Sequence, residues 1–172
     1  MPGPVVDPRA ARLLERYGAR FGGPDLPVPV EAIAEDLLGL AVALDDHLQV
    51  AGMLLPARRE IWLNGAEAAA SPGRRRFTLA HELGHWICHC GDGAAAPVLC
   101  RSEDVALGTG RELEREANVF AAELLMPREA VATAFAREGS AVALGARFGV
   151  STLALQWRLY NLGLAAERPV SA

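Results

Sequence analysis

The segment His-Glu-Leu-Gly-His at residues 81–85 constrains the fold of this chain more than any other stretch of its sequence. On an α-helix, residues four positions apart lie on the same face, about one turn from each other. His81 and His85 can therefore point their imidazoles at one tetrahedral metal ion. Apolar residues flank the segment, namely Phe77, Leu79, Ala80 and Leu83. We expect a buried helix over residues 72–90, with both histidines in its middle.

Glu82 lies next to the face of the two histidines and can reach the open coordination position of an ion that they bind. There it would take a proton from a water molecule and later deliver it to a leaving amine. His81, Glu82 and His85 thus form the His-Glu-x-x-His signature of zinc-dependent peptidases, with Glu82 as the catalytic base. The alternative is a core helix in which neighbouring groups satisfy the hydrogen bonds of two structural histidines.

A catalytic zinc ion needs a third protein ligand and keeps one position for water. The helix expected at 111–126 offers four carboxylates, at Glu112, Glu114, Glu116 and Glu123. Glu114 shares a helical face with small and apolar residues, which are Ala117, Asn118, Ala121 and Leu125. We therefore expect Glu114 to be the third ligand, with Glu116 as the alternative; Glu112 and Glu116 otherwise fit a solvated face. Asn118, one turn beyond Glu114, is placed to hold a ligand by a hydrogen bond.

The rest of the chain divides into short segments that predict an α+β fold. Amphipathic spacing and Gly or Pro boundaries predict helices at 8–20, 30–38, 111–126 and 128–137, and two short helices around Gly149 within 141–164. Three short apolar segments predict the strands of a small antiparallel sheet, at 40–44, 50–55 and 60–64. Residues 94–110 show no clear periodicity and are expected to form a loop.

Composition limits what the chain can do. Its 172 residues, 51% of them hydrophobic, suit one globular domain with a core that needs no disulfides. No apolar run approaches the ~18 residues of a membrane span, and residues 1–7 lack the order of a secretory signal. The net charge of −4 disfavours a protein that coats nucleic acid. An odd number of cysteines fits a reducing compartment, so the expected location is the cytoplasm.

Two longer segments resemble motifs of one peptidase family. Residues 76–85, Arg-Phe-Thr-Leu-Ala-His-Glu-Leu-Gly-His, are similar to the active-site helix of the ImmA/IrrE-type metallo-endopeptidases, and residues 114–127 are similar to that family's second motif. The resemblance extends in order and spacing over residues 8–137, and residues 141–164 resemble the family's C-terminal helical unit. Two motifs in the right order are far more specific than the five-residue signature alone.

The resemblance implies a fold, a cofactor and a class of substrate. The fold is a compact zincin-like core at residues 1–137, with the active-site helix on the small sheet, and a helix-turn-helix-like unit at 138–172 packed on that core. The implied cofactor is zinc, with three ligands and a general base at His81, His85, Glu114 and Glu82. Family members cleave helix-turn-helix transcriptional repressors and so relieve repression, for example under DNA-damage stress. The alternative is a regulator that binds zinc and a transcription factor without cutting it.

Residues 144–159 have the spacing of a helix-turn-helix, with Gly149 in the turn and Ser151 as the N-cap of the second helix. A DNA-binding module is therefore a third candidate function. The second helix offers few groups that read bases, mainly Thr152, Gln156 and Arg158, so we expect direct DNA binding to be negligible.

Two polar clusters near the histidine pair allow structural interpretations. The three arginines at 74–76 are expected to form a solvated face. Cys88, His89 and Cys90 follow the pair directly. Because adjacent positions on a helix point in different directions, we expect buried cysteines and an exposed His89 at the helix end. A second metal site or a thiol that competes for zinc is the alternative.

Overall fold

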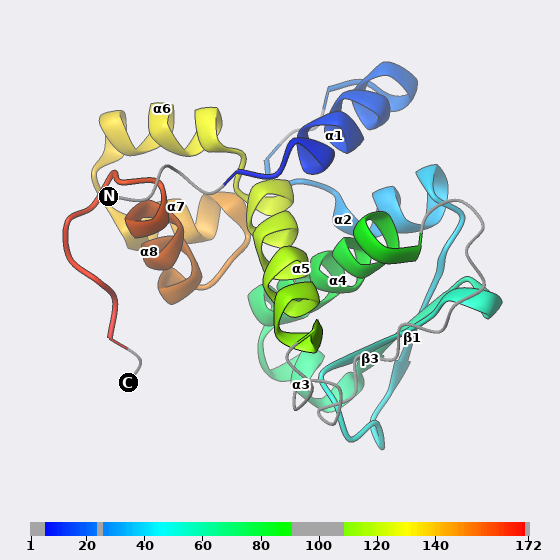
Figure 1. Ribbon diagram of the computed structural model, residues 1–172. Coiled ribbons are helices and arrows are strands. Elements are labelled where there is room, and N and C mark those ends of the chain that lie inside the picture. The colour runs from blue at the N-terminus through cyan, green and yellow to red at the C-terminus, as the bar shows by residue number, and fades with distance from the viewer. Residues whose placement is uncertain (1–5, 24–25, 91–108, 171–172) are drawn as a thin grey trace.

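The computed structural model of the chain describes residues 6–23, 26–90 and 109–170. The loop expected at 94–110 falls outside these residues except at its last two positions, which already belong to a helix, and Cys100 lies outside them as well. Within the described part, the helices lie mostly to one side of one small sheet (Figure 1). Among the described helices, none is both long enough and apolar enough to span a membrane.

The helices expected from the sequence are confirmed, with a few differences at their ends. Two of them end in a π-helical turn, η1 after α2 and η3 after α4. Their bounds are α1 Pro8–Phe21, α2 Val30–Ala32, η1 Ile33–Leu37, α4 Pro72–His85, η3 Trp86–Cys90, α5 Thr109–Leu125, α6 Arg128–Glu138, α7 Ala141–Phe148 and α8 Thr152–Asn161. Polar N-caps explain where several begin: the Ser71 side chain accepts a hydrogen bond from the backbone N–H of Arg74 in α4, and Ser151 does the same for Ala154 in α8. A short helix that the sequence did not predict, α3 (Gly65–Ala70), begins at the N-cap Asn64.

The three expected strands are present, but the expectation of an antiparallel sheet is wrong for one strand pair. β2 (Gly52–Leu55) pairs antiparallel with β3 (Glu60–Asn64), whereas β1 (Ala41–Asp45) pairs parallel with β3, so the strand order is β1-β3-β2. β2 and β3 form a hairpin through η2 (Pro56–Arg58) and Arg59, which has a positive φ of 54°. β1 therefore takes the other edge of β3, and β2 is left at the edge of the sheet. Apolar spacing predicts a strand but does not predict which neighbour it pairs with.

Helix α4 lies between the sheet and α5 (Figure 1). One buried core joins the three layers, with Leu54, Ile61 and Leu63 from the sheet, Leu79 and Leu83 from α4, and Phe120 and Leu124 from α5. Helices α4 and α5 approach closely at Gly84, where an added Cβ would lie 2.9 Å from the Cα of Ala117. The predicted α+β class, with the histidine-bearing helix on a small sheet, is therefore confirmed.

Helices α6, α7 and α8 group beside α5, away from the sheet (Figure 1). Arg76 of α4 ties this group to the core: its Nε donates to the carbonyl of Gly149 at 3.1 Å, and its Nη2 donates to the carbonyl of Val28 at 2.6 Å. The expected solvated face is thus wrong for Arg76, whose side chain is only 16% exposed. Arg74, two residues earlier, is exposed as expected.

Candidate metal centre

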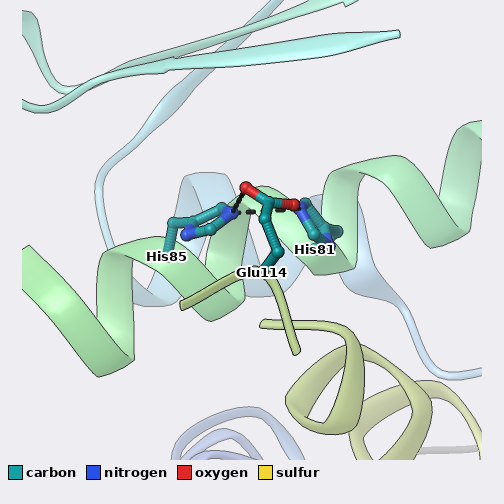
Figure 2. Close-up of side chains that lie close together, drawn as sticks. All are labelled: His81, His85 and Glu114. Carbon is teal, nitrogen blue, oxygen red and sulfur yellow. Dashed lines mark hydrogen bonds and ion pairs between the residues drawn. The ribbon is translucent and has the colours of Figure 1, made fainter. Parts of the chain in front are cut away.

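His81 and His85 project from the same face of α4, as their spacing predicts (Figure 2). Their Nε2 atoms lie 2.9 Å apart, so both rings present the same nitrogen to one point in space. His85 is fully buried and the His81 side chain is 16% exposed. The pair is thus mostly buried, and His81 is its more exposed member.

Glu114 of α5 reaches both imidazoles, and Figure 2 shows its carboxylate between the two rings. Its Oε2 lies 3.1 Å from Nε2 of His81, and its Oε1 lies 3.3 Å from Nε2 of His85. One ligand atom from each of the three residues lies within 4.8 Å of the others. The close approach of α4 and α5 at Gly84 brings this carboxylate, far away in the sequence, to the histidine pair.

The second ring nitrogen of each histidine also has a partner. Nδ1 of His81 lies 3.1 Å from Oδ1 of Asn118, the residue expected to hold a ligand. Nδ1 of His85 lies 3.1 Å from Nδ1 of His89, and Nε2 of His89 lies 3.5 Å from Oε2 of Glu116. Asn118 thus contacts the ring of His81, and His89 and Glu116 extend from the ring of His85.

The expectation that His89 is exposed at the helix end is therefore wrong. Its side chain is only 6% exposed and lies against Glu116 of α5, although η3 ends where the sequence predicted. The sequence did carry a signal for this position. His89 follows His85 by four residues, as His85 follows His81, so the three histidines lie on one face of the helix. Glu116 contacts His89 and, at 3.4 Å, Arg9, so it is not a freely solvated carboxylate and belongs to the surroundings of the centre.

Glu82 is buried beside the pair, and its surroundings raise its pKa. Burial raises the pKa of Glu82 to about 7, against the charge of His81, which lowers it. An added Cβ at Gly52 of β2 would lie 3.0 Å from Oε1 of Glu82 and 2.6 Å from Cγ2 of Thr78. The missing side chain at Gly52 thus makes room for the carboxylate against the edge strand, a requirement that sequence reasoning missed.

The protonation of His85 suits metal binding. Burial and the charge of His81 lower the pKa of His85 to about 4, so His85 is neutral near pH 7, the form that binds metal ions. Burial also lowers the pKa of His81, but its hydrogen bond to Glu114 and the nearby carboxylates raise it more, and the net shift is upward. Two imidazoles and one carboxylate, gathered around one point, form a donor set that zinc accepts with a position to spare.

The two cysteines of η3 have no place in this donor set. Cys90 is buried and Cys88 is half-buried, and both are free thiols. Burial raises the pKa of the Cys88 thiol to about 12, so it stays protonated and unreactive at neutral pH. This agrees with the structural interpretation of both residues.

Glu123, the last of the four candidate carboxylates, lies elsewhere. It is buried and forms an ion pair with Arg158 of α8, and its Oε1 accepts a hydrogen bond from the backbone N–H of Arg128 at 3.0 Å. Arg158 is therefore held inside the protein rather than displayed for DNA, contrary to the set of base-reading groups expected on α8.

Comparisons with known proteins place this geometry in a family. The sequence profile of the IrrE N-terminal-like domain, the peptidase M78 family, matches residues 41–160, which include the sheet, α4 and α5. A Mycobacterium tuberculosis transcriptional regulator has a similar solved structure, with a TM-score of 0.61 and 22% sequence identity over 90% of this chain. The alignment covers 47% of that regulator, so the chain spans about half of its length. No sequence among the curated proteins matches the chain. The match of the family profile to most of the chain shows that it belongs to the IrrE N-terminal-like family of M78 peptidases.

Proposed function

We propose that this protein is a zinc-dependent endopeptidase that hydrolyses a peptide bond in a partner protein. The observation that carries the proposal is the meeting of Glu114 with His81 and His85, with the buried Glu82 beside them. A metal site alone does not require Glu82. A carboxylate with a pKa raised to about 7, next to an open metal centre, suits a group that both takes and gives a proton.

His81, His85 and Glu114 would hold the ion, and Asn118 would keep the ring of His81 in place. The ion would supply a Lewis acid that polarises the peptide carbonyl and makes a water molecule easier to deprotonate. Glu82 would accept the proton of the attacking water on a carboxylate oxygen. It would then deliver that proton to the nitrogen of the departing amine, which completes the hydrolysis.

The proposed substrate is a helix-turn-helix transcriptional repressor, and cleavage would relieve repression in the cytoplasm. Support comes from the motifs at 76–85 and 114–127, which resemble those of peptidases with such substrates. The similar Mycobacterium tuberculosis structure is described as a transcriptional regulator, which agrees with a role in transcription. We propose further that residues 1–137 form the peptidase domain and that 138–172 pack on it as a dependent unit.

The test first asks whether a helix-turn-helix repressor is encoded beside this protein, and then follows cleavage of that repressor by intact-mass spectrometry. The Glu82→Gln variant keeps the shape and hydrogen-bonding reach of the side chain but cannot accept the proton. We expect it to fold and bind zinc, and to cut roughly 10²–10⁴-fold more slowly than the wild type. Glu112→Gln, an exposed change on α5, is the matched control and should cut at the wild-type rate.

Cleavage by the wild type should stop with a chelator and return with added zinc. If Glu82→Gln cuts the partner as fast as the wild type, the hydrolytic mechanism is wrong. If the zinc-loaded wild type binds the repressor tightly without ever cutting it, the protein is instead a non-cleaving regulator. DNA binding is not favoured, because Arg158 is buried in its ion pair with Glu123.

A further inference from the structure

A groove of about 610 Å³ lies between α4, α5 and α8. Its wall is mainly apolar, with Phe77 from α4, Ala122 and Met126 from α5, and Leu153, Ala154 and Trp157 from α8. Leu153 is 37% exposed, and Trp157 and Phe77 are half-buried, so apolar surface of the groove is accessible to solvent. Grooves of this size and character are typical of sites for small molecules or short peptide segments.

The groove adjoins a second hollow that reaches the candidate metal centre at Glu114. This second hollow, of about 360 Å³, is lined by Glu114, the expected ligand, and by Arg111 and Arg115. The two hollows share four residues, Asn118, Ala122, Arg158 and Asn161. Asn118 itself contacts the ring of His81. The groove is therefore connected, through these shared residues, with the hollow that Glu114 lines.

Two further side chains hold the aromatic wall of the groove in place. The ring of Trp157 lies edge-to-face with Tyr160, with centroids 6.0 Å apart, and the guanidinium of Arg168 lies 5.3 Å from the centre of the same ring. Such contacts restrict the orientation of a tryptophan ring. At the rim, the amides of Asn118 and Asn161 offer donors and acceptors of the kind that an extended peptide backbone pairs with.

We propose that this groove binds a bulky apolar side chain of the protein substrate, close to the bond that is cut. The inference rests on the proposed function, because the metal centre fixes where the substrate lies. The occupant is an extended peptide segment, since the groove shares residues with the hollow at Glu114 and its apolar wall is flanked by the amides of Asn118 and Asn161. The structure thus assigns the chain a preference for a large apolar residue, aromatic or leucine-like, beside the scissile bond.

The test uses peptide hydroxamates, which bind zinc in peptidase sites, and measures their affinity for the zinc-loaded full chain by calorimetry. The compounds come in pairs that differ only in a benzyl or a methyl side chain, placed on one side of the hydroxamate or on the other. In one of the two placements, we expect the benzyl compound to bind at least about tenfold more tightly, because it buries more apolar surface.

Two variants change the groove without touching the proposed zinc ligands. Ala122→Met fills the groove, and we expect it to reduce the affinity for the benzyl compound to that for the methyl compound, which itself stays unchanged. Trp157→Ala removes the aromatic wall and should also reduce the benzyl preference. Val142→Ala, an exposed change on α7 that lies outside the groove, is the control and should leave both affinities unchanged. Thermal unfolding of each variant confirms that it is folded.

Equal affinities for benzyl and methyl in both placements would overturn the groove proposal and leave the peptidase proposal standing. A benzyl preference that survives Ala122→Met would do the same. A zinc-loaded protein that binds no hydroxamate would overturn both proposals. A dimer that Ala122→Met dissociates would show that a second copy of the chain occupies the groove, and would overturn the substrate assignment.

Discussion

Each imidazole of the histidine pair is held at both of its ring nitrogens. The Nε2 atoms face Glu114, while Nδ1 of His81 contacts Asn118 and Nδ1 of His85 contacts His89. The Nδ1–H of His85 can donate a hydrogen bond to Nδ1 of His89 when the proton of His89 is on its Nε2, the nitrogen that faces Glu116. This arrangement keeps the Nε2 lone pair of His85 available for a metal ion.

His89 should therefore affect metal affinity without being a ligand. We expect His89→Ala to weaken zinc binding roughly 10–100-fold, as loss of a group behind a ligand commonly does. His89→Gln offers an amide oxygen to Nδ1 of His85 and should recover part of the affinity. The measurement is competition for zinc with a chelator of known affinity.

His47, an exposed histidine between β1 and β2, is the matched control, and His47→Ala should leave zinc affinity unchanged. Equal zinc affinity in His89→Ala and the wild type would show that the contact between His85 and His89 has no effect on the centre.

The sequence predicted much of the centre at the residue scale because helical spacing carries the information. Spacing of four placed His81 with His85, and the small, apolar face of 111–126 separated Glu114 from Glu112. What it did not show was the environment of His89, since the burial of a residue near a helix end depends on what the neighbouring helices contribute. The need for a glycine at position 52 was also hidden, because it arises between a strand and a helix far apart in the sequence.

At the scale of elements, the packing of α4 on α5 decides whether the three expected ligands meet. Gly84 sits at the closest approach, where an added Cβ would meet the Cα and the carbonyl oxygen of Ala117, both at 2.9 Å. Backbone atoms cannot rotate away as a flexible side chain can. Any side chain at position 84 must therefore push α5, and Glu114 with it, away from the histidines.

We expect Gly84→Ala to lower the free energy of unfolding by about 1–3 kcal/mol, as overpacking commonly does. It should also weaken zinc binding, although no ligand is changed. Chemical denaturation and zinc competition measure the two effects. Gly23→Ala is the control, because an added Cβ there meets nothing within 4 Å. A Gly84→Ala protein with wild-type stability and zinc affinity would contradict the tight contact between these helices.

Predictions of elements succeeded where local signals are strong and failed where partners are distant. Ser71 followed by Pro72 marked the start of α4, and the three apolar segments all became strands. The parallel pairing of β1 with β3 was not predicted, because short connections suggest neighbouring antiparallel strands. In this sheet β3 lies between β1 and β2, so these two consecutive strands are not neighbours.

At the scale of the whole molecule, buried polar contacts join the C-terminal helices to the core. Glu123 of α5 pairs with Arg158 of α8, and Nε of Arg158 also donates to the carbonyl of Met126 at 3.0 Å. Arg76 connects α4 to the turn between α7 and α8 through Gly149. These contacts support the proposal that residues 138–172 depend on the rest of the chain for their fold.

Glu123→Ala should be strongly destabilising, because it leaves the positive charge of Arg158 inside the protein without its carboxylate. We expect the free energy of unfolding to fall by about 3–5 kcal/mol, measured by chemical denaturation. Glu112→Ala on the exposed face of the same helix should change it by less than about 0.5 kcal/mol. Similar stabilities for the two variants would argue that the C-terminal helices are not held through this pair.

The central claim is that His81, His85 and Glu114 together hold one metal ion, and metal content per chain tests it most directly. Purified wild type, Glu114→Ala and Glu116→Ala are saturated with zinc, freed of loosely bound ions and analysed by mass spectrometry for metals. We predict one zinc per chain in the wild type and in Glu116→Ala, and almost none in Glu114→Ala. Zinc retained by Glu114→Ala but lost from Glu116→Ala would contradict the account, because the third ligand would then lie on the other face of α5.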